Sequence, residues 1–187
     1  MSKFFISVYV LVILQRLIEL VIAHNNATYL RSRGGYEVDA EHYKYIVSLH
    51  VLFLMGLLIE VRFLHPVRPS WWVISFSLFI IVQGMRVWCI ASLGKFWNTR
   101  IFVLPGAKPV KKGPYRFLRH PNYLVVIFEI LLLPLSFGAY YTAVIASLFN
   151  ALILRKRIKV EEVALTQVTL YNIVMKDVPR LIPSMRK

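Results

Sequence analysis

Five long runs of hydrophobic residues, separated by shorter polar segments, dominate the 187-residue chain. The runs lie at roughly Phe4–Ala23, Lys44–Leu64, Trp71–Leu93, Pro121–Phe137 and Ala139–Leu154. A helix needs about 20 mostly apolar residues to cross the hydrocarbon core of a bilayer, and these runs approach that length. The pattern predicts an all-α fold, a polytopic membrane protein with about five transmembrane helices.

The fourth and fifth runs are the shortest, and they meet at Ser136–Ala139. Pro134 and Gly138 disfavour one continuous helix there, because proline lacks a backbone N–H and glycine is a poor helix former. We expect the two runs to form a tight helical hairpin, with Pro134 kinking the end of its first arm.

Composition agrees with a membrane protein, since 58% of the residues are hydrophobic and the mean hydropathy is +0.60. The net charge of +14 comes from 23 Lys and Arg residues that lie between the apolar runs, not on one basic face. That distribution favours anionic lipid headgroups over nucleic acid as the partner. The single cysteine, Cys89, lies within an apolar run and cannot form a disulfide framework.

Positive charge also predicts the orientation of the helices. Of the Lys and Arg residues, 18 follow the first, third or fifth run, whereas only Lys3, Arg62 and Arg68 lie at the other side. The positive-inside rule then places the N-terminus outside and the C-terminus in the cytoplasm. The loop Gly94–His120 and the C-terminal segment would share the cytoplasmic face of the cell membrane, where we expect the active site.

Several charged residues interrupt the apolar runs. We expect Arg16, Glu19 and Arg86 to form structural pairs between helices or to extend toward the membrane surface. Glu129 falls two turns into the fourth run, where an ionised carboxylate must pair, stay protonated or line a wet cavity. Glu129 is therefore a candidate substrate contact. Alternatively, Glu19, Glu60, Arg86 and Glu129 mark the polar path of a small transporter, or the chain is a non-catalytic scaffold.

Polar, aromatic and cationic residues crowd the segment Gly113–Tyr123, between apolar runs. Gly113-Pro114 is typical of a turn, and His120-Pro121 predicts a helix that starts near Pro121. The unpaired N–H groups of a helix start carry partial positive charge, which suits a carboxylate or phosphate. The segment could equally be a basic loop that enters a transmembrane helix.

A second polar cluster, Arg155–Glu162, follows the fifth run. Arg157 and Glu161 are four residues apart and therefore share one helical face, either as an exposed ion pair or as part of a site. The predicted topology brings this cluster to the membrane level of His120–Tyr123. His24, His42, His50 and His65 are scattered, so we assign no metal, and the chain has no Gly-rich nucleotide-binding motif.

Together these elements resemble the isoprenylcysteine carboxyl methyltransferase family of integral membrane methyltransferases. The matching elements are Leu93–Trp97, Gly113-Pro114-Tyr115, Arg119-His120-Pro121-Asn122-Tyr123, Arg157, Glu161-Glu162 and Val178–Pro183. The resemblance covers roughly the C-terminal half. It implies one domain over residues 1–187, with a three-helix membrane part (1–93) and a cofactor-binding, catalytic half (94–187).

The resemblance implies S-adenosylmethionine as methyl donor, released as S-adenosylhomocysteine and held under a lid made by the central loop and the C-terminal segment. The implied cofactor contacts are Ala107, Lys108, Pro109, Val110, Tyr115, His120, Pro121, Asn122, Tyr123 and Glu161. Glu161 would accept a hydrogen bond from the donor's ammonium group. Arg157 would face the methyl acceptor, and Arg157 and Glu161 are the candidate catalytic residues.

The sequence differs from the family pattern at three places that bear on the acceptor. Leu124-Val125 stands where the family often has glycine after the motif tyrosine, and Ala107–Val110 replaces a His-x-Leu-Val segment. The Phe-Gly pair expected before the C-terminal tyrosine is missing around Val168–Tyr171. The chain looks more like short bacterial members, so we expect a lipophilic, membrane-dissolved acceptor with a carboxylate or an enolic or phenolic hydroxyl, such as a polyketide-type lipid. Prenylcysteine carboxyl methylation and phospholipid N-methylation are the alternatives. The acceptor's apolar tail would enter sideways from the bilayer between helices.

Overall fold

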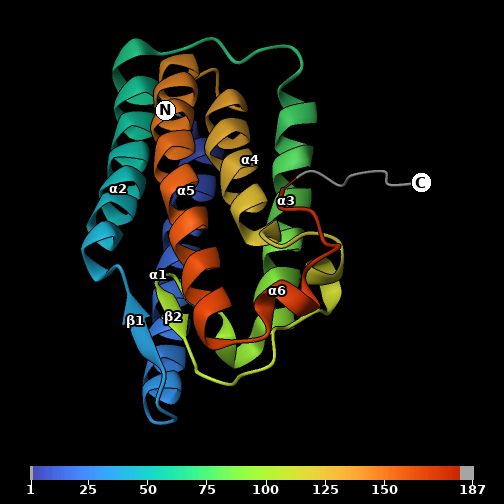
Figure 1. The fold of residues 1–187 in the computed structure, drawn as a ribbon. Helices are drawn as coiled ribbons and strands as arrows, with labels where there is room; N and C mark the ends of the chain where they lie inside the picture. The colour runs from blue at the N-terminus through green and yellow to red at the C-terminus, as the bar shows by residue number, and fades with distance from the viewer. Residues whose placement is uncertain (1, 182–187) are drawn as a thin grey trace.

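The computed structural model describes residues 2–181, and they form a mostly helical protein (Figure 1). In chain order, the elements are α1 (Lys3–Arg31), β1 (Tyr36–Val38), α2 (Tyr43–Ile59), α3 (Trp72–Leu93), β2 (Ile101–Val103), α4 (Pro121–Leu135), α5 (Tyr140–Val168) and α6 (Tyr171–Val174). The helices α1 to α5 run side by side as a bundle, and the two strands lie at one of its ends. We call that end the site end.

Three helical segments are long and apolar enough to cross a membrane: Lys3–Arg31, Ala40–Leu64 and Trp72–Phe96. The helix Pro121–Leu135 is apolar but shorter. These segments indicate a multi-pass membrane protein and agree with the first four predicted runs. Helices α1 and α5 continue beyond the predicted runs, which ended at Ala23 and Leu154, because an apolar run marks the lipid contact and not the end of a helix.

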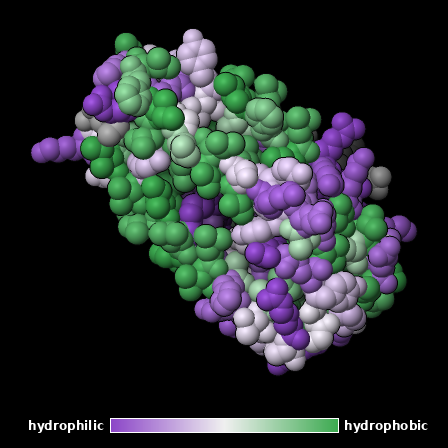
Figure 2. Space-filling model, turned by 90° about the vertical axis from the view of Figure 1, so that its left-hand side faces the viewer, coloured by the Kyte–Doolittle hydropathy of each residue, from purple (hydrophilic) through white to green (hydrophobic). Residues whose placement is uncertain are grey.

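The side chains that face outward from the bundle are largely apolar. Leu11, Leu52, Ile81 and Leu148 are each more than 60% exposed, whereas Phe5, Leu57 and Leu133 are fully buried between helices. Figure 2 shows hydrophobic residues over much of one side of the molecule, with hydrophilic residues gathered toward one end. An exposed apolar surface of this extent suits contact with lipid.

The tight turn between α4 and α5 matches the predicted hairpin, because residues 136–139 join two helices that pack together. Gly138 has a φ of +75°, and a Cβ at this position would lie 2.6 Å from the Val67 carbonyl oxygen. Only glycine fits both the left-handed backbone and that close approach. Pro134 lies in the last turn of α4, one residue before the helix ends at Leu135, so the missing N–H interrupts the helix only at its end.

The sequence did not predict the small antiparallel sheet. Val38 pairs with Ile101 and Tyr36 with Val103, which ties the segment after α1 to the segment after α3. Strands of three residues are too short to show an alternating pattern, and their partners lie more than 60 residues apart. The sheet therefore depends on the bundle that brings the two segments together, and the fold is mostly helical instead of all-α.

Four charged side chains meet inside the bundle, and we call Arg16, Glu19, Arg86 and Glu129 the ion cluster. Arg16 Nη1 lies 2.6 Å from Glu19 Oε2, and Arg86 Nη1 lies 3.1 Å from the same oxygen. Glu129 accepts hydrogen bonds from both arginines. The predicted pairing of Arg16, Glu19 and Arg86 is confirmed, and it joins α1, α3 and α4.

Candidate functional site

The start of α4 and the last third of α5 meet at the site end, although their residues lie about 40 positions apart. His120 Nδ1 lies 3.9 Å from Glu161 Oε2, and His120 Nε2 lies 3.0 Å from Glu162 Oε1. The imidazole also stacks on the Tyr123 ring with 5.2 Å between ring centroids. The two polar segments that the sequence singled out therefore form one cluster of side chains.

Tyr123 links Arg157 to Glu161. The Tyr123 hydroxyl donates a hydrogen bond to Glu161, and Arg157 Nε donates to the same hydroxyl oxygen at 2.8 Å. Arg157 Nη2 donates to the Thr99 carbonyl at 2.7 Å, whereas Nη1 has no hydrogen-bond partner among residues 2–181. Arg157 and Glu161, which we expected to pair directly, are therefore joined through the Tyr123 hydroxyl. Arg157 Nη1 remains available to bind a ligand. We call His120, Tyr123, Arg157, Glu161 and Glu162 the site cluster.

The C-terminal segment closes over this cluster through backbone and side-chain bonds. The Arg119 N–H donates to the Pro179 carbonyl at 2.8 Å, and the His120 N–H donates to the Arg180 carbonyl at 3.1 Å. Arg180 Nη2 lies 2.7 Å from Glu162 Oε2. Burial alone would raise the pKa of Glu162, but the hydrogen bonds from His120 and Arg180 outweigh it and lower that pKa to about 2. Glu162 is therefore ionised at neutral pH and can hold the segment in place.

The turn at Gly113-Pro114 fixes the central loop against α3. Gly113 has a φ of +55°, and a Cβ there would lie 2.0 Å from Ser92 Oγ. The helical turn Gly113–Arg116 that follows buries Tyr115, which packs against Cys89 and Val125. Gly113 thus allows the close contact that positions Tyr115 beside the site cluster.

Two adjoining cavities of about 120 and 70 Å³ lie between the central loop, α5 and the C-terminal segment. Tyr115, His120 and Glu161 line both. The first also contacts Ala107, Lys108, Pro109, Val110, Tyr171 and Met175, and the second contacts Trp97, Asn98, Asn122, Tyr123 and Arg157. Pro121 is buried at the first position of α4. The predicted cofactor residues other than Pro121 thus line one composite cavity, and Pro121 lies between two of them in the chain.

Some buried polar atoms beside these cavities have no hydrogen-bond partner among the described residues. They are Tyr115 Oη, Tyr171 Oη, Trp97 Nε1 and Asn122 Oδ1. Burial, followed by the charges of Glu161 and Glu162, raises the pKa of the Tyr171 phenol. Buried polar groups are nearly always hydrogen-bonded in native proteins, so this concentration suits a polar ligand.

A third cavity, of about 80 Å³, continues from the second into the bundle. It shares Asn122, Tyr123 and Arg157 with the second cavity, and it also contacts His50, Asn150, Arg16 and Arg86. The lining of this inner cavity includes the two arginines that hold Glu129, rather than Glu129 itself. The candidate substrate contact Glu129 therefore lies behind the cavity wall.

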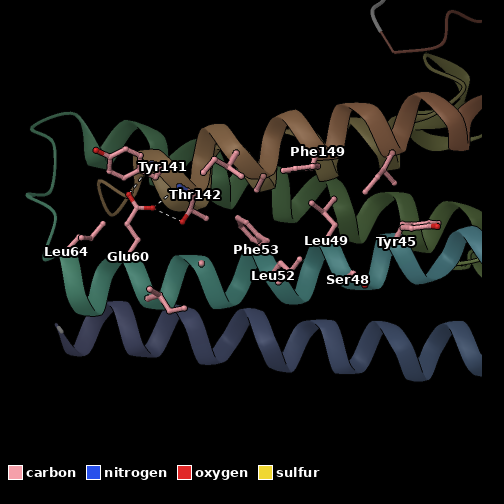
Figure 3. A pocket seen from close by; sticks show the side chains of 15 residues that line it. Tyr45, Ser48, Leu49, Leu52, Phe53, Glu60, Leu64, Tyr141, Thr142 and Phe149 are labelled. Carbon is pink, nitrogen blue, oxygen red and sulfur yellow. Dashed lines mark hydrogen bonds between the residues drawn. The ribbon is translucent and has the colours of Figure 1, made fainter.

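A large apolar groove of about 460 Å³ opens on the outer surface between α2 and α5 (Figure 3). Leu49 and Ile153 line both this groove and the inner cavity, so the two are adjacent. At the far end, Glu60 accepts hydrogen bonds from the Tyr141 and Thr142 N–H groups at 3.1 and 2.7 Å. Glu60 therefore caps the start of α5, although the sequence had offered it as part of a transport path.

Sequence reasoning missed several residues of the site. Glu162, not Glu161, makes the closer contact with His120, and Arg180 and Thr99 complete the hydrogen bonds around the cluster. The motif Glu161-Glu162 pointed to the right turn of α5, but neighbouring residues on a helix point about 100° apart. Of the resembling segment Val178–Pro183, Ile182 and Pro183 lie outside the described residues.

Comparisons with known proteins agree with the resemblance. The model of the isoprenylcysteine carboxyl methyltransferase (ICMT) family matches residues 73–167. The chain is 43% identical to uncharacterized protein YpbQ of Bacillus subtilis (strain 168), over 84% of this chain and 94% of the relative. It is 28% identical to an uncharacterized protein of Haemophilus influenzae, over 80% of this chain and 86% of the relative.

Proposed function

The chain belongs to the isoprenylcysteine carboxyl methyltransferase family, and from this membership we propose that it is an S-adenosylmethionine-dependent O-methyltransferase. Its acceptor is a lipophilic molecule dissolved in the membrane, with a carboxylate or an enolic or phenolic hydroxyl. The observation that carries the proposal is that the cavities adjoin one another. The composite cavity, lined by polar and apolar side chains, adjoins an inner cavity lined by Arg157, and that cavity adjoins the apolar surface groove.

The residues around the composite cavity fit the methyl donor. Glu161 is 27% exposed and can accept from an ammonium group, while Tyr171 Oη, Trp97 Nε1 and Asn122 Oδ1 are available for hydrogen bonds. Tyr115 and Tyr123 offer aromatic rings near the sulfonium and the adenine. The bound donor supplies a methyl carbon activated by positive sulfur.

Arg157 is the residue that faces the acceptor. Two of its nitrogens are fixed by Tyr123 and the Thr99 carbonyl, and its third nitrogen is available to an acceptor oxygen. A guanidinium held in this way favours an oxyanion and orients it. Orientation and exclusion of water supply most of the acceleration for an in-line methyl transfer.

The acceptor's tail lies in the groove between α2 and α5. The groove is apolar along most of its length, is open to the lipid side and ends near the inner cavity (Figure 3). Ile145 lines the groove, whereas its neighbour Val144 does not, and both are more than half exposed on α5. We expect Ile145→Trp to raise the apparent KM for the acceptor several-fold and Val144→Trp to leave it unchanged.

The five helices α1 to α5 cross the membrane with the site end in the cytoplasm. In the sequence, 18 Lys and Arg residues follow the first, third or fifth apolar run, against three at the other side, and this excess supports the orientation. The cytoplasm is also where the methyl donor is made. A cysteine introduced next to Lys108 should react with an impermeant maleimide only after the cell is opened, and reaction in intact cells would reverse the orientation.

Calorimetry of the purified protein with S-adenosylhomocysteine tests the enzyme class. We expect the wild type and a His24→Ala control to bind, because His24 is exposed on α1 outside the site. His120→Ala should lose binding, because it removes the side chain between Tyr123 and Glu162. A wild type that binds no S-adenosylhomocysteine would overturn the proposal and favour a transporter or scaffold.

The acceptor class is identified by incubating the protein with methyl-labelled donor and host lipid extract. A base-labile labelled product is a methyl ester, and a base-resistant one is an ether. A labelled phosphatidylethanolamine derivative would instead indicate N-methylation, for which the cationic Arg157 is an unsuitable partner.

A further inference from the structure

The inner cavity contains polar side chains that the proposed function has not used. His50 from α2 and Asn150 from α5 line it together with Arg157. Asn150 is only 3% exposed and contributes a polar amide to the lining. Buried polar groups in native proteins are nearly always hydrogen-bonded, so this lining suits a ligand with a polar group.

The hydrogen bond of His50 fixes the form of its ring. His50 Nδ1 lies 2.9 Å from the Ile46 carbonyl oxygen, one helical turn earlier in α2. A carbonyl oxygen can only accept, so Nδ1 carries the proton and Nε2 keeps its lone pair. Nε2 has no hydrogen-bond partner among the described residues and is therefore available to a ligand in the cavity.

We propose that His50 is the general base that takes the proton from a hydroxyl acceptor, and that Asn150 helps to orient that acceptor. This inference rests on the proposed methyltransferase function and narrows it to an enolic or phenolic substrate. A carboxylate acceptor is already ionised at neutral pH and needs no base. A hydroxyl acceptor gains from one, directly or through one water molecule.

The reaction is balanced as follows. The acceptor O–H bond breaks, and its proton moves to His50 Nε2. The acceptor oxygen, held by Arg157 Nη1, forms a bond to the methyl carbon, while the electron pair of the broken carbon–sulfur bond stays on sulfur. The imidazolium then returns its proton to water, and the products are the methyl ether and S-adenosylhomocysteine.

Charged groups surround His50 on several sides and bear on its proton uptake. Arg16 and Glu19 from α1, Arg86 from α3, Tyr123 from α4 and Arg157 from α5 line the same cavity, and Glu129 from α4 lies behind the two arginines of the ion cluster. The ion cluster contributes two positive and two negative charges, and Arg157 adds a further positive charge. A cation beside the acceptor oxygen favours the ionised acceptor.

A binding experiment tests this role without turnover. The probe is a nitrophenol with a long alkyl chain, whose absorbance reports its ionisation, added to the detergent-purified protein with S-adenosylhomocysteine. We expect the probe to ionise at lower pH on the wild type than in protein-free micelles. His50→Gln should move the ionisation back by about one pH unit or more, and His24→Gln should not. Identical ionisation on the wild type and on His50→Gln would overturn the proposal.

Turnover of the lipid-extract acceptor provides the second readout. Loss of a general base costs about 10²- to 10⁴-fold in rate. His50→Gln should therefore be slowed at least 100-fold at neutral pH, and the rate should recover as rising pH ionises the acceptor directly. A labelled methyl ester, or a His50→Gln rate equal to the wild type, would overturn the role of His50 and leave the methyltransferase intact. Failure of the wild type to bind S-adenosylhomocysteine would instead remove the proposed function itself.

Discussion

The ion cluster inside the bundle and the site cluster at its end both bury arginine and glutamate side chains, but they hold their charges differently. In the ion cluster, two arginines and two glutamates from three helices neutralise one another. In the site cluster, Arg157 and Glu161 are joined through Tyr123, and Arg157 Nη1 and the partly exposed Glu161 face cavities. A closed charge network stabilises the bundle, whereas an open one can bind a ligand.

The largest expected effect is a loss of stability when one carboxylate is removed from the ion cluster. Glu129→Leu leaves Arg16 and Arg86 to share the single carboxylate of Glu19. Breaking a buried ion network by removing one partner typically costs about 3–5 kcal/mol, so we expect a loss of that size in the free energy of unfolding. Denaturation of the detergent-purified protein measures it.

A charge-balanced variant is the matched control for that loss. Arg86→Met combined with Glu129→Leu removes one charge of each sign and leaves Arg16 paired with Glu19 at 2.6 Å. Because apolar replacement of a complete buried pair is often nearly neutral, the double variant should recover most of the lost stability. If Glu129→Leu alone is as stable as the wild type, the ion cluster has no structural role.

The second effect concerns Glu161 in the site cluster. A substitution there should lower the affinity for S-adenosylhomocysteine and leave the stability of the protein nearly unchanged. Glu161→Gln removes the charge that accepts from the donor's ammonium group. A hydrogen bond to a charged group contributes about 1.5–3 kcal/mol, so affinity for S-adenosylhomocysteine should fall roughly 10- to 150-fold. Calorimetry measures the affinity, and Glu41→Gln, at an exposed site, is the control. A large fall in Tm with unchanged affinity would make Glu161 a structural residue.

A smaller effect is expected from the tyrosine that joins Arg157 to Glu161. Tyr123→Phe keeps the ring beside His120 but removes the hydroxyl that both charged residues use. The loss of a hydrogen bond of about 1 kcal/mol predicts roughly fivefold weaker binding of S-adenosylhomocysteine. Tyr141→Phe, at an exposed site near the opposite end of the bundle, should bind normally. A Tyr123→Phe variant with wild-type affinity would mean that the bridge does not shape the site.

The sequence predicted the bundle better than it predicted contacts between chain segments. The observed starts of α3 and α4, at Trp72 and Pro121, lie within one residue of prediction, because proline and polar residues border those apolar runs. The convergence of His120 with Glu161 also followed from topology alone, since both had to leave the membrane on one side. The family resemblance supplied the expected roles of the residues, which hydropathy cannot provide, and those roles stay predictions.

The side-chain contacts that the sequence did not predict depend on the rotation of helices about their axes and on residues far apart in the chain. Whether Glu161 or Glu162 contacts His120 depends on the rotation of α5. Because apolar and charged residues are mixed along α5, its sequence pattern does not indicate that rotation. His50 looked like one of several scattered histidines, because its neighbours Asn150 and Arg157 come from a helix about 100 residues away. The strands β1 and β2 were missed for the same reason.

The smallest expected effect is the pH dependence of the bond between the C-terminal segment and Glu162. Its pKa of about 2 lies below the ordinary value of 4.5, so the folded state favours the ionised form. The stabilisation is complete above about pH 4.5 and is lost as the pH falls toward 2. Because Arg180 is 64% exposed and screened by water, we expect Glu162→Gln to lower Tm by only about 2 °C at neutral pH. That difference from the wild type should shrink as the pH falls to 2 and vanish below the pKa of Glu162, and a difference that persisted there would show that Glu162 acts through its shape and not its charge.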